Sequence, residues 1–598
     1  MSIDSPWLET LLRLTTGSAR FVPGDAPPYN PRHCLAIYHA APAAPPSLEL
    51  PTLLVGDVLG GRSGLGCTLL SPLPARPPEG AILIGVWDDI ARDHPHLLAG
   101  LPGPPEYGYH IHLGRHVLLV AKRRAGCVAG LQTLAQLLAQ FEGDLLPAGR
   151  LEDAPVFPIR SILYNPGEQH PNLQALTRLL GVPFAFKGCR LHIRLDASGP
   201  VGARPGPGCV QEAEAAEFGA VCREYGIELI PHVAWLHRWG ADRDARILDD
   251  CRRLHDQFGV ERIGLQGAWS SEGRNRFLRL LDKARGSGYI LSADAALAIA
   301  DDLPPGWIEA LEYWDGTESP LRLERLAEGG HPFGLIVPMA SRGFAIASPS
   351  SAEARLSAAC AAAVVSGARE FGYGLLNRNW GRLWEMELLP ATAALILGWS
   401  GPSAAGDATG QAARLIYGLM GDQVLAWLER LSTLYRAAAF FTAAGEWLLG
   451  AAFGEWPTLA DPAAALDDSA SAGESGQLSE ALRQLRRKLP RNPQTLELFD
   501  YGLDALSALR AQARRLSAAR SLCARARSDD AEAGRAAREE VEALIGELRP
   551  FALRTERLRS ERGILSLEAD ALARRLARLN RARAELETNG ISAAEEFL

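Results

Sequence analysis

The chain has 598 residues, of which 47% are hydrophobic and 22% charged, an ordinary globular composition. Its formal net charge is −8, and no block of lysine or arginine stands free of acidic residues, so no nucleic-acid partner is expected. The N-terminus lacks the basic start of a signal peptide, and no apolar run reaches the length of a membrane helix. These features favour a cytoplasmic protein with no membrane partner.

The nine cysteines include no Cys-x-x-Cys pair, so neither a disulfide framework nor a metal site is expected. The glycine-rich segment GDVLGGRSGLG (56–66) lacks the Gly-Lys-Ser/Thr ending of a phosphate-binding loop. We therefore expect no cofactor.

Residues 1–155 are predicted to form a small α+β domain. Three apolar runs, LPTLLVG (50–56), GAILIGVW (80–87) and HVLLVAK (116–122), are typical of strands. The segment CVAGLQTLAQLLAQF (127–141) has the apolar spacing of a helix.

Between residues 156 and 400, short β-type runs alternate regularly with helical stretches such as 213–226 and 276–288. We predict eight strands, at 160–165, 190–195, 227–233, 262–266, 289–293, 308–314, 333–339 and 373–377. Eight strand–helix units over about 240 residues match the size of an α/β (β/α)₈ TIM barrel. A doubly wound open sheet is the structural alternative, but the regular alternation favours closure.

After Trp399 the strand patterns nearly vanish, and residues 401–598 are predicted to form an all-helical domain. An Ala/Ser/Asp-rich segment at 457–478 is interpreted as a linker. The last 100 residues have the pattern of long antiparallel helices with charged outer faces. Such faces are usually only solvated, but they also allow a homo-oligomer to assemble through these helices.

In (β/α)₈ barrels the active site lies at the C-terminal ends of the strands, so the residues just after each predicted strand are the candidates. These candidates are mostly tryptophans and carboxylates. Aromatic faces pack on the C–H faces of sugar rings while carboxylates bind the hydroxyl groups, so such residues are typical of a carbohydrate site. The candidate catalytic carboxylates are Glu272, Asp294, Asp315 and Glu385. The candidate substrate-binding residues after the strands are His237, Gln266, Trp269, Trp314 and Trp380.

Several segments, taken together, resemble family 20 glycoside hydrolases, and most closely their hexosaminidase D-like branch. Their order and spacing carry the resemblance, which covers about residues 80–400. The segments are EYGYHIH (106–112), GCVAGLQTLAQLL (126–138), ELIPHVAWLH (228–237), LSADAAL (291–297), LEYWDG (311–316) and NRNWGRLWEMELLPATAALILGWS (377–400). The resemblance implies a β-N-acetylhexosaminidase-like barrel in which Arg160, at the start of the first strand, binds the sugar.

The chain departs from this family at the end of the fourth strand. The family has an Asp-Glu pair there: the aspartate orients the 2-acetamido group of the substrate, and the glutamate protonates the leaving oxygen. In the segment IGLQGAWSSEG (263–273), Gln266 and Gly267 occupy those positions. Glycine can donate no proton, so we expect weak or absent activity on simple aryl N-acetylglucosaminides.

Three interpretations stay open. In the first, Glu272 has taken over as the acid, although it also fits the first turn of a helix capped by Ser270 or Ser271. In the second, the protein hydrolyses a different glycoside with other carboxylates. In the third, the barrel binds sugar without cleaving it and serves as a scaffold. In each case we expect Trp314 and Trp380 to form the walls of one pocket, with Arg160 and Asp294 at its polar end.

Overall fold

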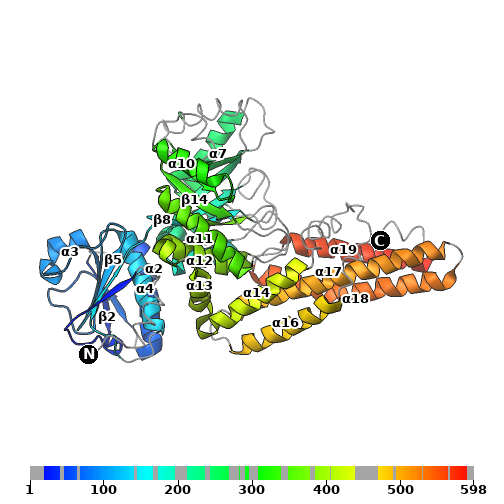
Figure 1. Ribbon diagram of the computed structural model, residues 1–598, viewed down its shortest axis with the longest axis horizontal. Coiled ribbons are helices and arrows are strands. Elements are labelled where there is room, and N and C mark those ends of the chain that lie inside the picture. The colour runs from blue at the N-terminus through cyan, green and yellow to red at the C-terminus, as the bar shows by residue number, and fades with distance from the viewer. Residues whose placement is uncertain are drawn as a thin grey trace.

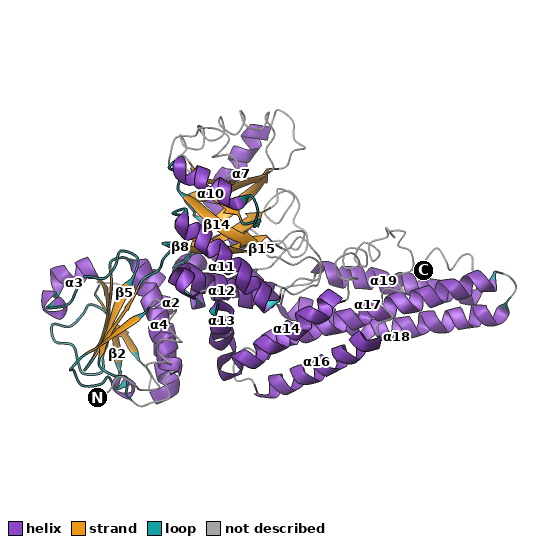
Figure 2. Ribbon diagram, viewed as in Figure 1, coloured by secondary structure: helices purple, strands orange, loops and turns teal. Residues whose placement is uncertain are grey.

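The computed structural model describes residues 19–40, 46–63, 67–140, 145–165, 173–195, 212–235, 243–267, 282, 290–294, 308–338, 348–376, 384–404, 406–437, 469–488, 493–527, 530–562 and 566–588. The described chain contains a seven-stranded sheet, a closed eight-stranded barrel and a set of long helices, in that order (Figures 1 and 2). None of the described helices is both long enough and apolar enough to cross a membrane.

The N-terminal sheet has the strand order β1-β7-β5-β6-β4-β2-β3. Its strands are β1 (Arg20–Pro23), β2 (Ala36–His39), β3 (Thr68–Leu70), β4 (Ile82–Val86), β5 (Tyr109–Leu113), β6 (Val117–Ala121) and β7 (Gly149–Asp153). The helices are α2 (Pro46–Ser63), α3 (Trp87–Asp93) and α4 (Arg124–Gln140). The predicted strands at 80–87 and 116–122 and the helix at 127–141 are therefore confirmed as β4, β6 and α4.

The predicted strand at 50–56 is wrong, because these residues lie inside α2. Leu48, Thr52, Val55 and Leu59 are buried, and their spacing of three to four residues places them on one helical face. That face packs beside α4 (Figure 1). A short apolar run satisfies both a strand and a buried helix, and the tertiary contact decides between them.

The barrel closes in the order β10-β11-β12-β13-β14-β15-β8-β9, and every neighbouring pair is parallel. Its strands are β8 (Ile159–Asn165), β9 (Arg190–Leu195), β10 (Glu228–Trp235), β11 (Arg262–Gly267), β12 (Ile290–Asp294), β13 (Ile308–Tyr313), β14 (Phe333–Pro338) and β15 (Glu370–Leu376). All eight predicted strands are confirmed, with shifts of at most three residues at their ends, and the open-sheet alternative is excluded.

Six described helices follow strands of the barrel, and the predicted helix at 276–288 lies outside the described residues apart from residue 282. The six are α5 (Leu173–Ala185), α6 (Glu212–Glu224), α7 (Arg243–Phe258), α10 (Ser319–Glu328), α11 (Pro349–Val365) and α12 (Leu388–Ser400).

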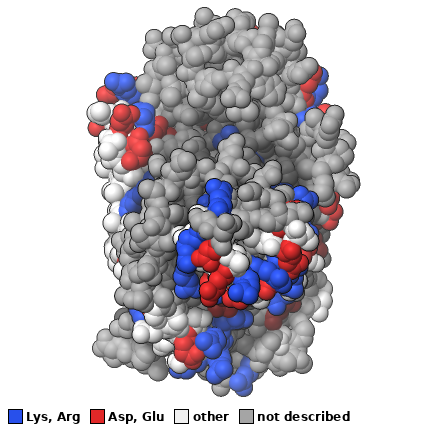
Figure 3. Space-filling model, turned by 90° about the vertical axis from the view of Figure 1, so that its right-hand side faces the viewer, with Lys and Arg blue, Asp and Glu red and all other residues white. Residues whose placement is uncertain are grey.

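The C-terminal part is helical wherever it is described, and its three longest helices run side by side in an extended arm (Figures 1 and 2). Its helices are α13 (Ala408–Tyr417), α14 (Gly421–Ala437), α16 (Ser469–Lys488), α17 (Pro493–Ala526), α18 (Ala531–Arg562) and α19 (Ser566–Thr588). Positive and negative side chains are mixed on the face seen in Figure 3. Arg515 of α17, for example, pairs with Glu540 and Glu547 of α18 at 2.8 and 2.5 Å.

The predicted linker at 457–478 is wrong from Ser469 onward, where α16 begins. Leu478 and Leu482, four residues apart, are buried on one face of α16. The indole Nε1 of Trp427 also donates a hydrogen bond to the carbonyl oxygen of Leu478 at 3.0 Å. Packing of this face therefore overrides a composition that is typical of a loop.

A buried polar cluster joins the N-terminal sheet to the barrel. The carboxylate of Asp153, at the end of β7, accepts hydrogen bonds from Tyr109 Oη, Lys187 Nζ and Trp399 Nε1, each at 2.7 Å. The ammonium of Lys187 also lies 4.1 Å from the ring centroid of Trp399. Burial lowers the pKa of Lys187, and the charge of Asp153 opposes that shift.

Candidate functional site

Side chains on the barrel strands alternate between the inner face and the surrounding helices. On β13, Ile308 and Ala310 pack in the outer core, whereas Leu311 meets Leu163 and Ile336 inside the barrel. These three inner residues form an apolar belt, and the partly buried Tyr313 packs against it. The belt divides the interior into a base, at the N-terminal ends of the strands, and a mouth, at their C-terminal ends.

The base of the barrel is filled by charged groups that satisfy one another. The guanidinium of Arg190, 1% exposed, contacts Glu370 at 2.5 Å, Glu309 at 2.9 Å and Glu228 at 2.8 Å. Arg262 adds a second cation beside Glu228. Burial alone would raise the pKa of Glu370, but the charge of Arg190 holds it well below its ordinary value.

Between the base and the mouth lie two buried histidines. His192 Nε2 is 2.7 Å from an oxygen of Glu370, and His192 Nδ1 is 2.8 Å from His232 Nε2. Both rings are at most 1% exposed.

Polar residues also occupy the inner face at the mouth. Asn165 is the last residue of β8, and Arg194 pairs in register with His232. Arg190 and His192 contact inner groups, so the alternation along β9 places Arg194 on the same face. With Tyr313, these side chains come from three different strands to one end of the barrel.

Two of the predicted site residues are described at this end of the barrel by their backbone alone. The backbone of Asp294, the last residue of β12, pairs with the inner residue Leu311. The backbone of Gln266 pairs with that of Ala234. Gln266 lies two residues after Gly264, which faces the ring of His232. Gln266 is followed by Gly267 at the end of β11, so the departure from the Asp-Glu pair does fall at the end of the fourth strand.

The remaining predictions at this end of the barrel lie mostly outside the described residues. Glu385 lies in a 3₁₀ helix, η3 (Trp384–Glu387), and only its backbone belongs to the described part. His237, Trp269, Glu272 and Trp380 lie outside the described residues altogether.

Arg160 does not reach the mouth, which corrects its predicted role as a sugar ligand. It is the second residue of β8, at the base end, and its guanidinium donates to the carbonyl oxygens of Phe157, Pro158 and Lys187. The same group stacks over Trp399 at 4.8 Å. Its side chain is thus committed to the buried junction between the sheet and the barrel.

Asp315 is also corrected as a candidate acid. One carboxylate oxygen accepts hydrogen bonds from the backbone N–H groups of residues 317–319, just before α10, and the other pairs with Arg322 at 2.5 Å. Burial is the largest single effect and acts to raise the pKa of Asp315, but the hydrogen bonds from the backbone, Arg322 and Ser319 together hold this pKa well below its ordinary value. A carboxyl group with a lowered pKa is a poor proton donor at neutral pH, and this one organises the start of a helix.

Trp314 follows β13 at the C-terminal end of the barrel, as predicted, but its side chain does not line the interior. It is 6% exposed and belongs to the outer core, while the preceding Tyr313 packs inside. Replacing Trp314 by alanine should therefore cost about 3–5 kcal/mol of stability, as for other buried tryptophans.

Thermal or urea unfolding of Trp314→Ala, with Tyr313→Phe as the control that keeps a ring at the inner position, measures this effect. An unfolding midpoint of Trp314→Ala equal to that of the wild type would restore the predicted role as a pocket wall.

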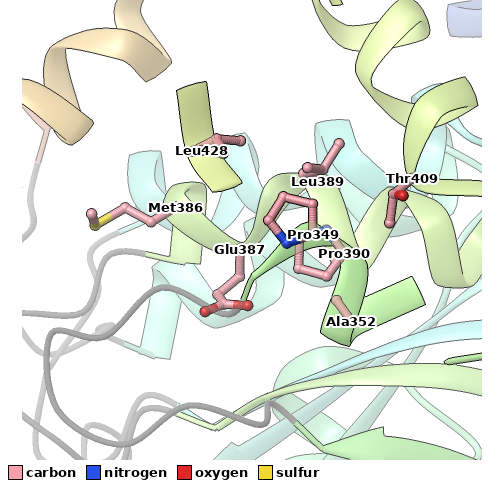
Figure 4. A pocket seen from close by; sticks show the side chains of 8 residues that line it. All are labelled: Pro349, Ala352, Met386, Glu387, Leu389, Pro390, Thr409 and Leu428. Atoms are coloured by element: carbon pink, nitrogen blue, oxygen red, sulfur yellow. The ribbon is translucent and has the colours of Figure 1, made fainter. Parts of the chain in front are cut away.

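A small cavity lies between α11, α12, α13 and α14, outside the barrel. Its lining, drawn in Figure 4, consists of Pro349, Ala352, Met386, Glu387, Leu389, Pro390, Thr409 and Leu428. Glu387 is 4% exposed, and its carboxylate accepts a hydrogen bond from Tyr373 at 2.8 Å. Tyr373 packs in the outer core, so this carboxylate does not face the barrel interior.

Sequence reasoning missed Asn165, Arg194 and Tyr313. Asn165 ends the first predicted strand, a position like that of Gln266 on the fourth, and its place at a strand end is the signal that indicates it. Arg194 lies two residues after His192 on β9, and Tyr313 lies two residues after Leu311 on β13. Side chains two residues apart on a strand share a face, and this spacing is the signal that indicates both residues. In the described part of the chain, no group of three or more His, Cys, Asp or Glu residues is arranged to hold a metal ion.

No family model and no curated protein matches the sequence. Solved structures match in fold at low identity. CpGH84D is 12% identical, with 89% of this chain and 93% of that chain covered at a TM-score of 0.54. A mutant Streptomyces plicatus beta-hexosaminidase in complex with GlcNAc as product is 17% identical, with coverage of 70% and 95% and a TM-score of 0.51.

A third match is a GH138 enzyme targeting pectin rhamnogalacturonan II, which is 9% identical, with coverage of 93% and 80% and a TM-score of 0.50. At these identities the likeness shows the fold alone. The chain therefore has the barrel fold of these glycoside hydrolases, and this likeness supports the resemblance to family 20 that the sequence motifs indicate.

Proposed function

We propose that the protein is a glycoside hydrolase acting on N-acetylhexosaminides or a related glycoside, with the sugar bound at the C-terminal mouth of the barrel. The observation that carries the proposal is the change in polarity of the inner side chains along the barrel axis. The base is charged and the belt is apolar, while Asn165, Arg194 and Tyr313 hold inner positions toward the mouth on three different strands. Polar groups that converge at the mouth of an apolar-walled barrel are typical of a ligand site.

Asp294 is the preferred candidate for the catalytic carboxylate. Its backbone pairs with that of Leu311 on the neighbouring strand, two residues before Tyr313, whereas Asp315 is committed to α10. Glu272 and Glu385 stay candidates for the second carboxyl group. If the two groups lie roughly 5–5.5 Å apart, the reaction retains the anomeric configuration, and a separation of roughly 6.5–9.5 Å indicates inversion.

A catalytically silent, carbohydrate-binding or scaffold barrel is the alternative, and the sequence at the end of β11 favours it. Gln266 and Gly267 can supply neither a carboxylate nor a proton there. Under this alternative the arm of α17, α18 and α19 would assemble copies of the chain.

The same proposal includes a division into domains at residues 1–155, 156–400 and 401–598, and a cytoplasmic location. The first boundary falls between β7 and β8, and the second falls directly after α12. Folding of the segment 1–155 expressed alone would support an independent first domain.

A broad glycoside screen tests the proposal, with Asp294→Asn and Asp315→Asn as a matched pair. Both variants change one aspartate to asparagine; Asp294 ends β12, and Asp315 follows the neighbouring strand β13. Loss of an acid–base group should slow hydrolysis by roughly 10²–10⁴-fold in Asp294→Asn, while Asp315→Asn should keep most of the activity. Glu272→Gln and Glu385→Gln then identify the partner carboxyl.

The screen includes aryl N-acetylglucosaminides, on which we expect weak activity. Robust hydrolysis that survives substitution of Asp294, Glu272 and Glu385 would contradict the site assignment. Saturable sugar binding without turnover of any glycoside would favour the silent barrel instead.

A further inference from the structure

Two cysteines lie next to each other at the edge of the N-terminal sheet. Cys34 comes shortly before β2, and Cys67 directly precedes β3. These two strands are parallel neighbours, and the N–H group of Thr68 donates a hydrogen bond to the carbonyl oxygen of Leu35 at 3.0 Å. The thiol of Cys67 donates to the carbonyl oxygen of Cys34 at 3.2 Å. The pairing of β2 with β3 therefore brings together two thiols that are 33 residues apart in the chain.

Both thiols face the same side of the sheet. Cys34 is 1% exposed and belongs to the core cluster between the sheet and the helices α2 and α4, and Cys67 is partly buried against that cluster. The thiol of Cys34 is within hydrogen-bonding reach of the thiol of Cys67 and of the hydroxyl group of Tyr29. Both cysteines are free thiols in the structure. This arrangement lets a reagent from solvent reach the partly exposed Cys67 first, with Cys34 behind it as a second, internal thiol.

We propose that Cys34 and Cys67 form an internal disulfide when the protein meets a small-molecule disulfide such as oxidised glutathione. In the first step the Cys67 thiolate attacks one sulfur of oxidised glutathione, forms a mixed disulfide and releases one glutathione thiolate, which takes up the proton that Cys67 lost. In the second step the Cys34 thiolate attacks the sulfur of Cys67, and the second glutathione leaves and takes up the proton of Cys34. Two protein thiols are thereby oxidised, and one molecule of oxidised glutathione is reduced to two thiols. This modification site lies in the N-terminal sheet, outside the barrel, and does not depend on the proposed sugar site.

The surroundings of the two thiols make this reaction slow at neutral pH. Burial and the neighbouring Cys34 raise the pKa of Cys67 to about 12, and burial raises the pKa of Cys34. Since only the thiolate attacks a disulfide, the rate should increase roughly tenfold for each pH unit between pH 7 and pH 9. The pair is therefore suited to a lasting crosslink rather than to rapid sensing of an oxidant.

The disulfide would close a loop around α2 and attach the edge of the sheet covalently. β3 has three residues and, among the described strands, pairs only with β2. α2 lies between the two cysteines in the chain and packs beside α4. A crosslink across this unit restricts the unfolded chain, so the oxidised protein should have a higher unfolding midpoint in urea than the reduced protein.

Peptide mapping of the full-length protein tests the proposal. The folded, reduced wild type is incubated with oxidised glutathione without denaturant, the remaining thiols are alkylated, and the protein is digested with trypsin. Cleavage after Arg62 separates Cys34 from Cys67, so the two stay together only through a disulfide. We expect a joined peptide pair, with a mass two hydrogen atoms below the sum of the two free peptides, that disappears on reduction with dithiothreitol.

Matched variants assign the bond, and the mapping of the wild type decides the proposal even if a variant fails to fold. Cys67→Ser should give no crosslink and no increase in the unfolding midpoint, whereas Cys189→Ser, which removes another partly buried cysteine, should keep both. Crosslinking of Cys67 to a different cysteine, or recovery of Cys34 and Cys67 only in alkylated or glutathione-bound form, would overturn the proposal. A joined pair that forms only after the addition of urea would overturn it as well, because the folded strands would then not hold the two thiols together.

Discussion

Replacing Arg190 by methionine should destabilise the barrel by about 3–5 kcal/mol, the range for a broken buried ion pair. The substitution keeps the apolar stem but leaves Glu228, Glu309 and Glu370 close together without the cation that all three contact. The denaturant midpoint of the barrel transition measures the effect. As a control, Arg92→Met removes a cation from a solvent-exposed pair and should leave the midpoint unchanged.

The pH dependence of this effect has a definite sign. In the wild type the pKa of Glu370 is lowered on folding, so its contribution to stability is present above the ordinary value of 4.5 and is lost as the pH falls below it. In Arg190→Met the neighbouring carboxylates raise one another's pKa, and the folded state takes up protons. The difference between variant and wild type should therefore shrink from pH 7 to pH 5. A difference that stays constant or grows would contradict this account.

Replacing Asp153 by alanine should have an effect of similar size at the junction of the sheet and the barrel. Lys187 and Asp153 have side chains 3% and 0% exposed, so the variant leaves a buried ammonium without its partner. Removal of one member of such a pair costs about 3–5 kcal/mol. Tyr109 and Trp399 also lose the acceptor of their hydrogen bonds.

Urea unfolding followed by tryptophan fluorescence measures this loss, because Trp399 lies in the cluster. Glu106→Ala is the matched control, since it removes the carboxylate of an exposed arginine pair in the loops next to the same sheet and should not change the midpoint measurably. A midpoint for Asp153→Ala equal to that of this control would mean that the buried pair does not hold the two parts together.

The eight strands of the barrel could be predicted because each is a short β-type run between helical stretches, a pattern that local sequence carries. The failed strand at 50–56 shows the limit of that signal, since Thr52 and Val55 lie on a helical face that only packing against α4 reveals. The start of α16 could not be predicted for the same reason, since the packing of its buried face is not evident from local composition.

The site was harder to predict because both faces of a barrel strand are buried, so hydrophobicity does not separate inside from outside. On β13 the inner positions include Glu309 and Tyr313, while Ile308 and Trp314 pack outward. The ion pair that places Glu309 inside joins it to Arg190, 119 residues earlier, and no local pattern indicates it. The structural role of Asp315 could be predicted from the sequence, because an aspartate shortly before Ser319-Pro320 already has the pattern of a helix start.

The most direct test of the sugar site is a crystal structure of the protein with N-acetylglucosamine bound. We expect the sugar ring at the C-terminal mouth, within hydrogen-bond distance of Tyr313 or Asp294, above the apolar belt. A sugar bound at any other place on the chain with the mouth empty would contradict it.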